Sequence, residues 1–260
     1  MSFIVSHPSL LFLICLTGLM LVVEIGIWLR RFSKGLDEGD QALVKSARDG
    51  LTVLLSFLLG FAVAMTLPYY EARRDLITQE ANAISTLDER AQLLPDPYDE
   101  RIRQLLPQYV DARLEFARPE DQAEYRAAAA EAGRLESAMW HEIVALVRQH
   151  PELVNGPIVA QVSAGMNSVE DFRAARLAAD ERRIPSTIWL VLSTIAVITC
   201  FVVGYGMQRR LLLAMFVLPL TVAIVLSLVA ELENPRTGFI RIQQASMLRV
   251  RQELREELGH

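Results

Sequence analysis

The sequence predicts an all-α membrane protein with four transmembrane helices and a helical extramembrane domain between the second and third spans. Four windows of the 260-residue chain carry almost no charge, although 22% of all residues are charged. Each window reaches the roughly 20 apolar residues that an α-helix needs to cross the hydrocarbon of a bilayer. No segment shows the alternating pattern of a strand, so helices account for the whole prediction.

The four spans are predicted at residues 9–29, 51–70, 187–206 and 211–230. The first ends at Arg30 and Arg31, with Trp28 placed as an interfacial anchor, and Tyr69 and Tyr70 mark the far end of the second. These positions divide the chain into a first helix pair (1–70), the extramembrane domain (71–186), a second helix pair (187–231) and a charged C-terminal tail (232–260).

Apolar residues at spacings of three and four predict that the second span continues as a helix to Leu94, where Pro95 and Pro97 break the chain. Further domain helices are expected over 98–117, 120–150 and 157–183, each bounded by prolines. The domain is acidic, with 21 acidic and 14 basic residues over 71–186, which does not suggest a nucleic-acid partner.

Basic residues are dense in the two short loops between spans, and such loops usually face the cytoplasm. They are Arg30, Arg31, Lys34, Lys45, Arg48, Arg209 and Arg210. We therefore expect an integral protein of a bacterial inner (plasma) membrane, with both termini and the extramembrane domain outside the cytoplasm. No cleavable signal peptide is expected, because no Lys or Arg precedes the first apolar run.

No enzymatic constellation is present in the sequence. It contains no phosphate-binding glycine loop or nucleophile elbow, and its four histidines lack the spacing of metal ligands. The two cysteines, Cys15 and Cys200, both lie in apolar spans, where a buried thiol is expected rather than a disulfide. We predict a protein that is not an enzyme and has no cofactor or metal site.

Small residues recur every fourth position along the second span, at Thr52, Ser56, Gly60 and Ala64. Such a stripe is typical of close helix packing. It also suits a helix that lines a narrow hydrated pathway, so these four residues are the pore-lining candidates.

Charged residues in or beside the spans form a second set of candidates, because burying a charge in a bilayer is costly. They are Glu24, Glu231 and Glu233. Glu24 either has a function within the membrane or extends to the nearby interface.

Four polar residues follow the second span and are candidates for an ion vestibule or for anchoring helices: Glu80, Asn82, Ser85 and Thr86. Residues two apart on a helix point about 200° apart, so Glu80 and Asn82 must face different ways. Glu80 shares the face of Ile84 and Leu87, which predicts a buried carboxylate paired with Arg73, Arg74 or an arginine of another helix. Asn82 is then the better vestibule candidate.

Several motifs in this chain resemble the bestrophin-like family of bacterial and plastid membrane proteins. The segments that carry the resemblance are 54–61, Arg73-Arg74, Glu80-Ala81-Asn82-Ala83-Ile84, Leu93-Leu94-Pro95, Tyr98, Leu105-Leu106, 109–113 and 233–240. One departure is Glu233, where the family pattern has aspartate. The resemblance implies kinship with bestrophins, which are oligomeric anion channels.

The leading hypothesis is therefore a homo-oligomeric ion channel in a lipid bilayer, with the second span of each subunit around a central pore and inorganic ions as the permeating species. Five subunits are expected by analogy alone. The alternative is a membrane-anchored sensor or assembly scaffold that binds a ligand or partner through its acidic domain.

Overall fold

The computed structural model describes residues 8–32, 37–116, 122–207, 212–233, 240 and 242–258. The described elements are α2 (Pro8–Phe32), α3 (Glu38–Ala91), α4 (Tyr98–Phe116), α5 (Gln122–Gln149), the short 3₁₀ helix η1 (Pro151–Leu153), α6 (Pro157–Glu181), α7 (Ser186–Gly206), α8 (Leu212–Glu233) and α9 (Ala245–Leu258). The described part contains helices and no strands, and four helical stretches are long and apolar enough to cross a membrane. The predicted fold class is confirmed at this level.

The predicted continuation of the second span is present as one helix, α3, which has 54 residues and includes Pro68. It ends at Ala91, and Leu93 and Leu94 form the turn before Tyr98 opens α4. The starts of α4 and α6 agree with the sequence analysis. Ala117, Glu120 and the basic residues Lys34, Arg209 and Arg210 lie outside the described residues.

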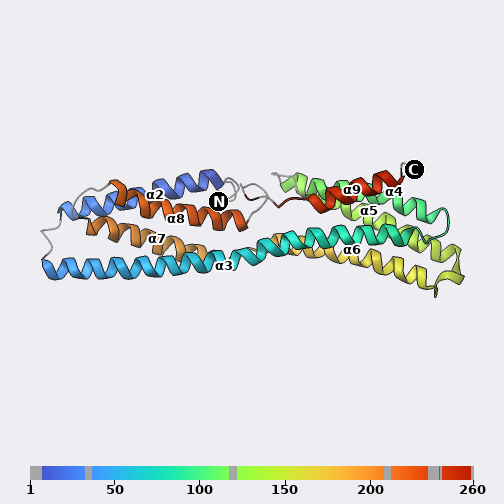
Figure 1. Ribbon diagram of the computed structural model, residues 1–260, viewed down its shortest axis with the longest axis horizontal. Helices are drawn as coiled ribbons and strands as arrows, with labels where there is room; N and C mark the ends of the chain where they lie inside the picture. The colour runs from blue at the N-terminus through green and yellow to red at the C-terminus, as the bar shows by residue number, and fades with distance from the viewer. Residues whose placement is uncertain are drawn as a thin grey trace. The chain divides into compact units, whose positions relative to one another are not determined.

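The chain divides into two compact units, and residues 1–70 and 183–241 form unit 1. Within it, α2 packs against α7 and α8 (Figure 1). Leu55, Leu59 and Ala62 of α3 complete an apolar core with Val23 of α2 and Ala196 of α7. Unit 1 therefore contains all four spans.

Two glycines let α2 and α7 approach closely. A Cβ atom added to Gly26 would lie 2.8 Å from the backbone nitrogen of Tyr205, and one added to Gly204 would lie 2.9 Å from the carbonyl carbon of Val23. Real Cβ atoms essentially never come so close to another atom. Glycine is therefore required at both positions for this approach, in keeping with the small residues found at helix interfaces in membranes.

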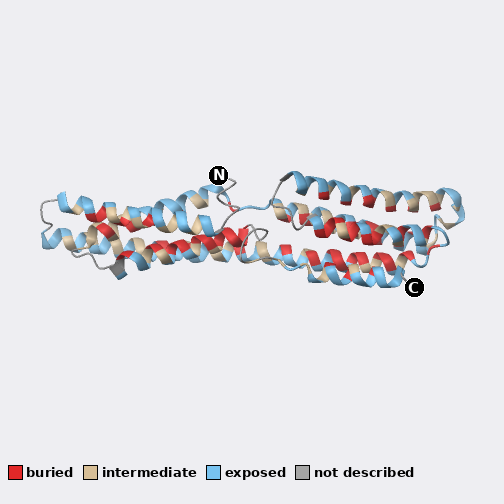
Figure 2. Ribbon diagram, turned by 90° about the horizontal axis from the view of Figure 1, so that it is seen from above, coloured by how far each residue is buried: buried red, intermediate tan, exposed pale blue. Residues whose placement is uncertain are grey.

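Residues 71–182 and 242–260 form unit 2, a helical bundle built from the later part of α3 with α4, α5, α6 and α9. Its core is a single apolar cluster that includes Leu87, Leu106, Leu135 and Val169. Buried residues follow the inward faces of its helices (Figure 2). This is the periodicity that the sequence showed over the extramembrane domain.

The sequence predicts a separate charged tail over 232–260, but the structure differs in this part of the chain. The structure instead forms α9 and packs it against α4 in unit 2. Met247, Val250 and Leu254 lie three and four residues apart and are buried. The many charges on the other faces of α9 hide this short apolar stripe in the sequence.

Candidate functional site

Glu80 of α3 lies at the centre of a buried ionic cluster in unit 2. Its side chain and that of Arg113 on α4 are both 0% exposed. Arg113 donates from Nε to Oε1 over 2.5 Å and from Nη2 to Oε2 over 3.1 Å. Arg176 of α6 donates to Oε2 over 2.5 Å, and the Tyr109 hydroxyl donates to Oε1 over 3.2 Å. One carboxylate therefore connects three helices.

The charges of this cluster favour ionised Glu80. Burial alone would raise the pKa of its carboxyl, but Arg176 and Arg113 outweigh burial and hold the pKa below its usual value. Burial and the adjacent Glu80 carboxylate raise the pKa of Tyr109 well above its usual range. Tyr109 is therefore a neutral hydrogen-bond donor at physiological pH.

Two further arginines, Arg73 and Arg173, make polar contacts between helices of unit 2. Arg73 of α3 donates to the carbonyl oxygens of Ala179 at 3.0 Å and Arg182 at 2.8 Å, at the C-terminal end of α6, where a cation interacts favourably with the helix dipole. Arg173 of α6 pairs with Glu136 of α5. Polar contacts thus fix α3, α5 and α6 within the apolar core.

The other candidates on this part of α3 are placed differently. Asn82 is exposed, and Ser85 and Thr86 are half-buried. Glu80 and Asn82 therefore lie on different faces of α3, one buried and one exposed, as helix geometry requires. The cluster around Glu80 is closed to solvent and suited to anchoring helices, whereas Asn82 is accessible.

The stripe of small residues lies on the outer face of α3 within unit 1. Thr52 is half-buried, and Ser56, Gly60 and Ala64 are exposed. The hydroxyl of Ser56 donates to the backbone oxygen of Thr52 on the same helix, and nothing lies within 4 Å of a Cβ added to Gly60. Helix packing inside one subunit therefore does not explain why position 60 is a glycine.

The intramembrane and interfacial charges divide into two kinds. Glu233, the last residue of α8, is buried and accepts hydrogen bonds from Ile184 N and Trp189 Nε1, both over 3.0 Å. Glu231 is also buried and accepts from the backbone nitrogen of Ile240 over 3.3 Å. Glu24 on α2 is only half-buried. The two glutamates of α8 therefore bind, through hydrogen bonds, the start of α7 and the segment that follows α8.

The sequence identifies the central residue of the site, Glu80, but not the residues that bind it. It does not assign Arg113, Arg176 or Tyr109 to this carboxylate. Tyr109 and Arg113 are four residues apart and share one helix face, which is the available signal. Arg176 has no local signal, because only packing brings α6 to α3. Among the described residues, no group of three or more His, Cys, Asp or Glu side chains could hold a metal ion.

Four apolar spans in one unit and a helical bundle with a buried ionic centre in the other define a helical integral membrane protein. A match to the Bestrophin-like domain covers residues 17–247. The chain belongs to the bestrophin-like family.

Solved structures share this fold at low sequence identity. A bacterial bestrophin homologue from Klebsiella pneumoniae is 17% identical with a TM-score of 0.69, and the alignment covers 95% of this chain and 98% of the other. A tryptophan-to-alanine variant of that homologue has a TM-score of 0.70 at 17% identity, covering 96% and 97%. A membrane protein with a proline-to-alanine substitution is 18% identical, with a TM-score of 0.69 and coverages of 96% and 99%. No curated protein matches significantly.

Proposed function

We propose that this protein is a homo-oligomeric ion channel in a bacterial inner membrane, in which α3 of each subunit surrounds a central pore. The observation that carries the proposal is the stripe Ser56, Gly60 and Ala64, which is exposed on a span whose opposite face is packed. Family membership supports a channel, and the analogy with bestrophins suggests five subunits. Thr52 extends the stripe toward the start of the span.

One subunit does not offer an obvious hydrated path. The described core of unit 1 is apolar, with Leu19, Leu55, Leu59 and Val229 among its members. Ions need polar groups or water along their route. A pore between several subunits, lined by the exposed face of α3, meets this need without opening the core. Asn82, exposed beyond the span, is our candidate for the vestibule of that pore.

A second exposed stripe on α3 provides an internal comparison. Val53 is 70% exposed, Phe57 69% and Phe61 52%, again at spacings of four. Adjacent residues on a helix point about 100° apart, so Phe57 and Ser56 face different directions. If Ser56 faces the pore, the aromatic stripe contacts lipid or a neighbouring subunit.

Cysteine accessibility tests this assignment. Purified protein carrying Ser56→Cys or Gly60→Cys, reconstituted in planar bilayers, is expected to lose current on treatment with a charged thiol reagent, while Phe57→Cys and Phe61→Cys are not. The background is Cys15→Ala with Cys200→Ala, which removes both native thiols. The reverse pattern would place the aromatic stripe on the axis. A monomer that carries no current would instead favour a membrane-anchored sensor or scaffold.

Gly60→Leu tests the same face through assembly. Nothing lies within 4 Å of a Cβ added at this exposed position, so we expect the subunit fold to tolerate leucine. It would separate closely packed neighbours or block a narrow pore. We expect a changed oligomer mass or a lost current. Retention of both would show that the stripe faces lipid.

The proposed orientation places the two short basic loops in the cytoplasm and unit 2 outside. Labelling of intact cells with an impermeant thiol reagent, in the same cysteine-free background, tests it. Glu124→Cys is expected to react and Lys34→Cys is not. Reaction at position 34 with protection at position 124 would reverse the orientation.

A further inference from the structure

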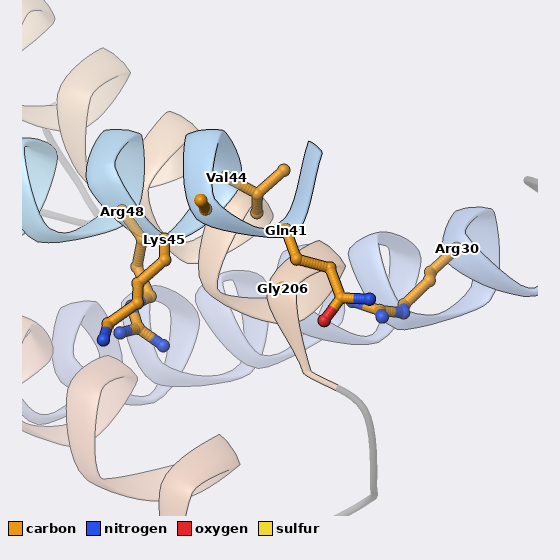
Figure 3. Close-up of a pocket in the computed structure, with 7 residues that line it drawn as sticks. Arg30, Gln41, Val44, Lys45, Arg48 and Gly206 are labelled. Carbon is orange, nitrogen blue, oxygen red and sulfur yellow. The ribbon is translucent and has the colours of Figure 1, made fainter. Parts of the chain in front are cut away.

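Unit 1 contains a basic pocket where α2 and α7 end and α3 begins. Its volume is about 270 Å³, and Arg30, Gln41, Ala42, Val44, Lys45, Arg48 and Gly206 line it. Figure 3 shows Lys45 and Arg48 extending from the same side of α3, and Gln41 and Arg30 pointing toward one another across the pocket that they line. Three cations from two helices therefore surround one small cavity.

The described lining residues include no acid. Arg48 is paired with Asp49 over 2.8 Å, which leaves a surplus of two positive charges among these groups. The acids at the start of α3, Asp37, Glu38 and Asp40, do not line the pocket. Like charges at a spacing of three on a helix, as at Lys45 and Arg48, repel each other. A bound anion would relieve that repulsion.

Arg30 is held in place by the end of α7. It donates from Nη1 to the carbonyl oxygen of Tyr205 over 2.9 Å. A Cβ added to the neighbouring Gly206 would lie 3.4 Å from Cγ1 of Val44, so α7 closes against α3 at this point. Arg30 thereby covers a carbonyl that would otherwise repel an anion, and the pocket is formed by the packing of three helices.

We propose that this pocket binds a phosphate-bearing anion, and specifically the headgroup of an anionic phospholipid. The pocket lies at the ends of predicted spans, where headgroups are found. Its volume is slightly below the roughly 300–1,000 Å³ of pockets that hold whole small molecules, which suits a headgroup whose chains remain outside. Exposed apolar side chains on the same helix segments can contact those chains: Trp28, Phe32 and Leu43.

Titration of the full-length protein with phosphatidylglycerol tests the proposal. Protein in phosphatidylcholine nanodiscs receives increasing phosphatidylglycerol, and native mass spectrometry counts retained lipids while a thermal melt follows stability. An ion pair between one side chain of the pocket and a phosphate contributes about 1 kcal/mol at such a partly exposed site. We therefore expect affinity to fall roughly fivefold in Lys45→Gln and roughly 25-fold in Lys45→Gln/Arg48→Gln, with Lys45→Arg close to wild type.

The matched control is Arg31→Gln, which removes an exposed cation beside Arg30 that does not line the pocket. It is expected to bind phosphatidylglycerol like the wild type. An equal loss of affinity in Arg31→Gln and Lys45→Gln would show general surface attraction and overturn the proposal. Stabilisation by inorganic phosphate at the same affinity as the lipid would overturn the lipid assignment and leave a soluble anion as the ligand. Neither readout depends on channel activity, so the test is independent of the proposed function.

Discussion

The two units of this chain are both helical bundles, but different interactions hold them together. Unit 2 buries six charged side chains among its described residues: Arg73, Glu80, Asp88, Arg113, Glu136 and Arg176. The described part of unit 1 buries two, Glu231 and Glu233, both in the last turn of α8. Between its helix ends, unit 1 relies on apolar packing and on close backbone approach at Gly26 and Gly204.

With unit 1 in the bilayer and unit 2 in water, as we propose, the difference follows from the solvent around each bundle. Lipid is as apolar as a leucine side chain, so burying apolar surface drives helix association weakly in a membrane, and close packing through small residues replaces it. A water-facing bundle gains from apolar burial and can add a buried ion pair wherever every charge has a partner. The comparison therefore predicts that charge substitutions damage unit 2 most and glycine substitutions damage unit 1.

The largest effect is expected from Glu80→Ala. It leaves Arg113 and Arg176 buried without their carboxylate, and removing one partner of such a pair typically costs 3–5 kcal/mol. Thermal unfolding in detergent measures the loss, and hydrogen exchange should locate it in unit 2. Glu89→Ala, an exposed acid on the same helix, is the control and is expected to change little. Equal melting of the two variants would remove Glu80 from its anchoring role.

Acid should reproduce part of this loss. The pKa of Glu80 is lowered in the folded protein from an ordinary value of 4.5. Its contribution is therefore complete above about pH 4.5 and is lost as pH falls through the lower folded pKa. The difference in stability between wild type and Glu80→Gln should stay constant from neutral pH to about 4.5 and shrink below it. A difference that already shrinks between pH 7 and 5 would contradict a lowered pKa.

A smaller effect is expected in unit 1 from Gly204→Ala. The added methyl group meets the backbone of Val23 and forces α2 and α7 apart, and overpacking of this kind typically costs 1–3 kcal/mol. Gly18→Ala is the control, because nothing lies within 4 Å of a Cβ there. Hydrogen exchange should show faster exchange in α2 and α7, with unit 2 unchanged. An equally mild response at both positions would mean that the close approach of the two helices is not needed.

The smallest effect is expected from Arg255→Gln in α9, for which a substitution in the buried face of the same helix is the contrast. Arg255 donates to Asp111 over 2.6 Å, but the two side chains are 57% and 38% exposed, and pairs in contact with solvent contribute only about 0.2–1 kcal/mol. Arg255→Gln should therefore leave α9 in place. Met247→Ala, which empties a buried position, should release it at a cost of about 2–5 kcal/mol. Limited proteolysis of the C-terminus distinguishes the two variants. Comparable cleavage of Arg255→Gln and Met247→Ala would mean that ion pairs, and not only apolar contacts, hold α9 in place.

The sequence alone determined the elements of this fold with the exception of α9. Uncharged windows identify the spans because the bilayer penalises charge wherever it occurs, and apolar spacing identifies the helices of unit 2 because a helix repeats every 3.6 residues. Glu80 could be assigned to the buried side of α3 for the same reason, since it shares a face with Ile84. Each of these signals lies within one helix.

Only the tertiary structure decided which residues meet across helices. Arg176 follows Glu80 by 96 positions, and Gly204 lies far along the chain from Val23, so no local pattern indicates either contact. The same is true of α9, whose three buried residues become meaningful only against α4. Partners and close approaches depend on how helices pack, and packing is a property of surfaces that the chain brings together only on folding.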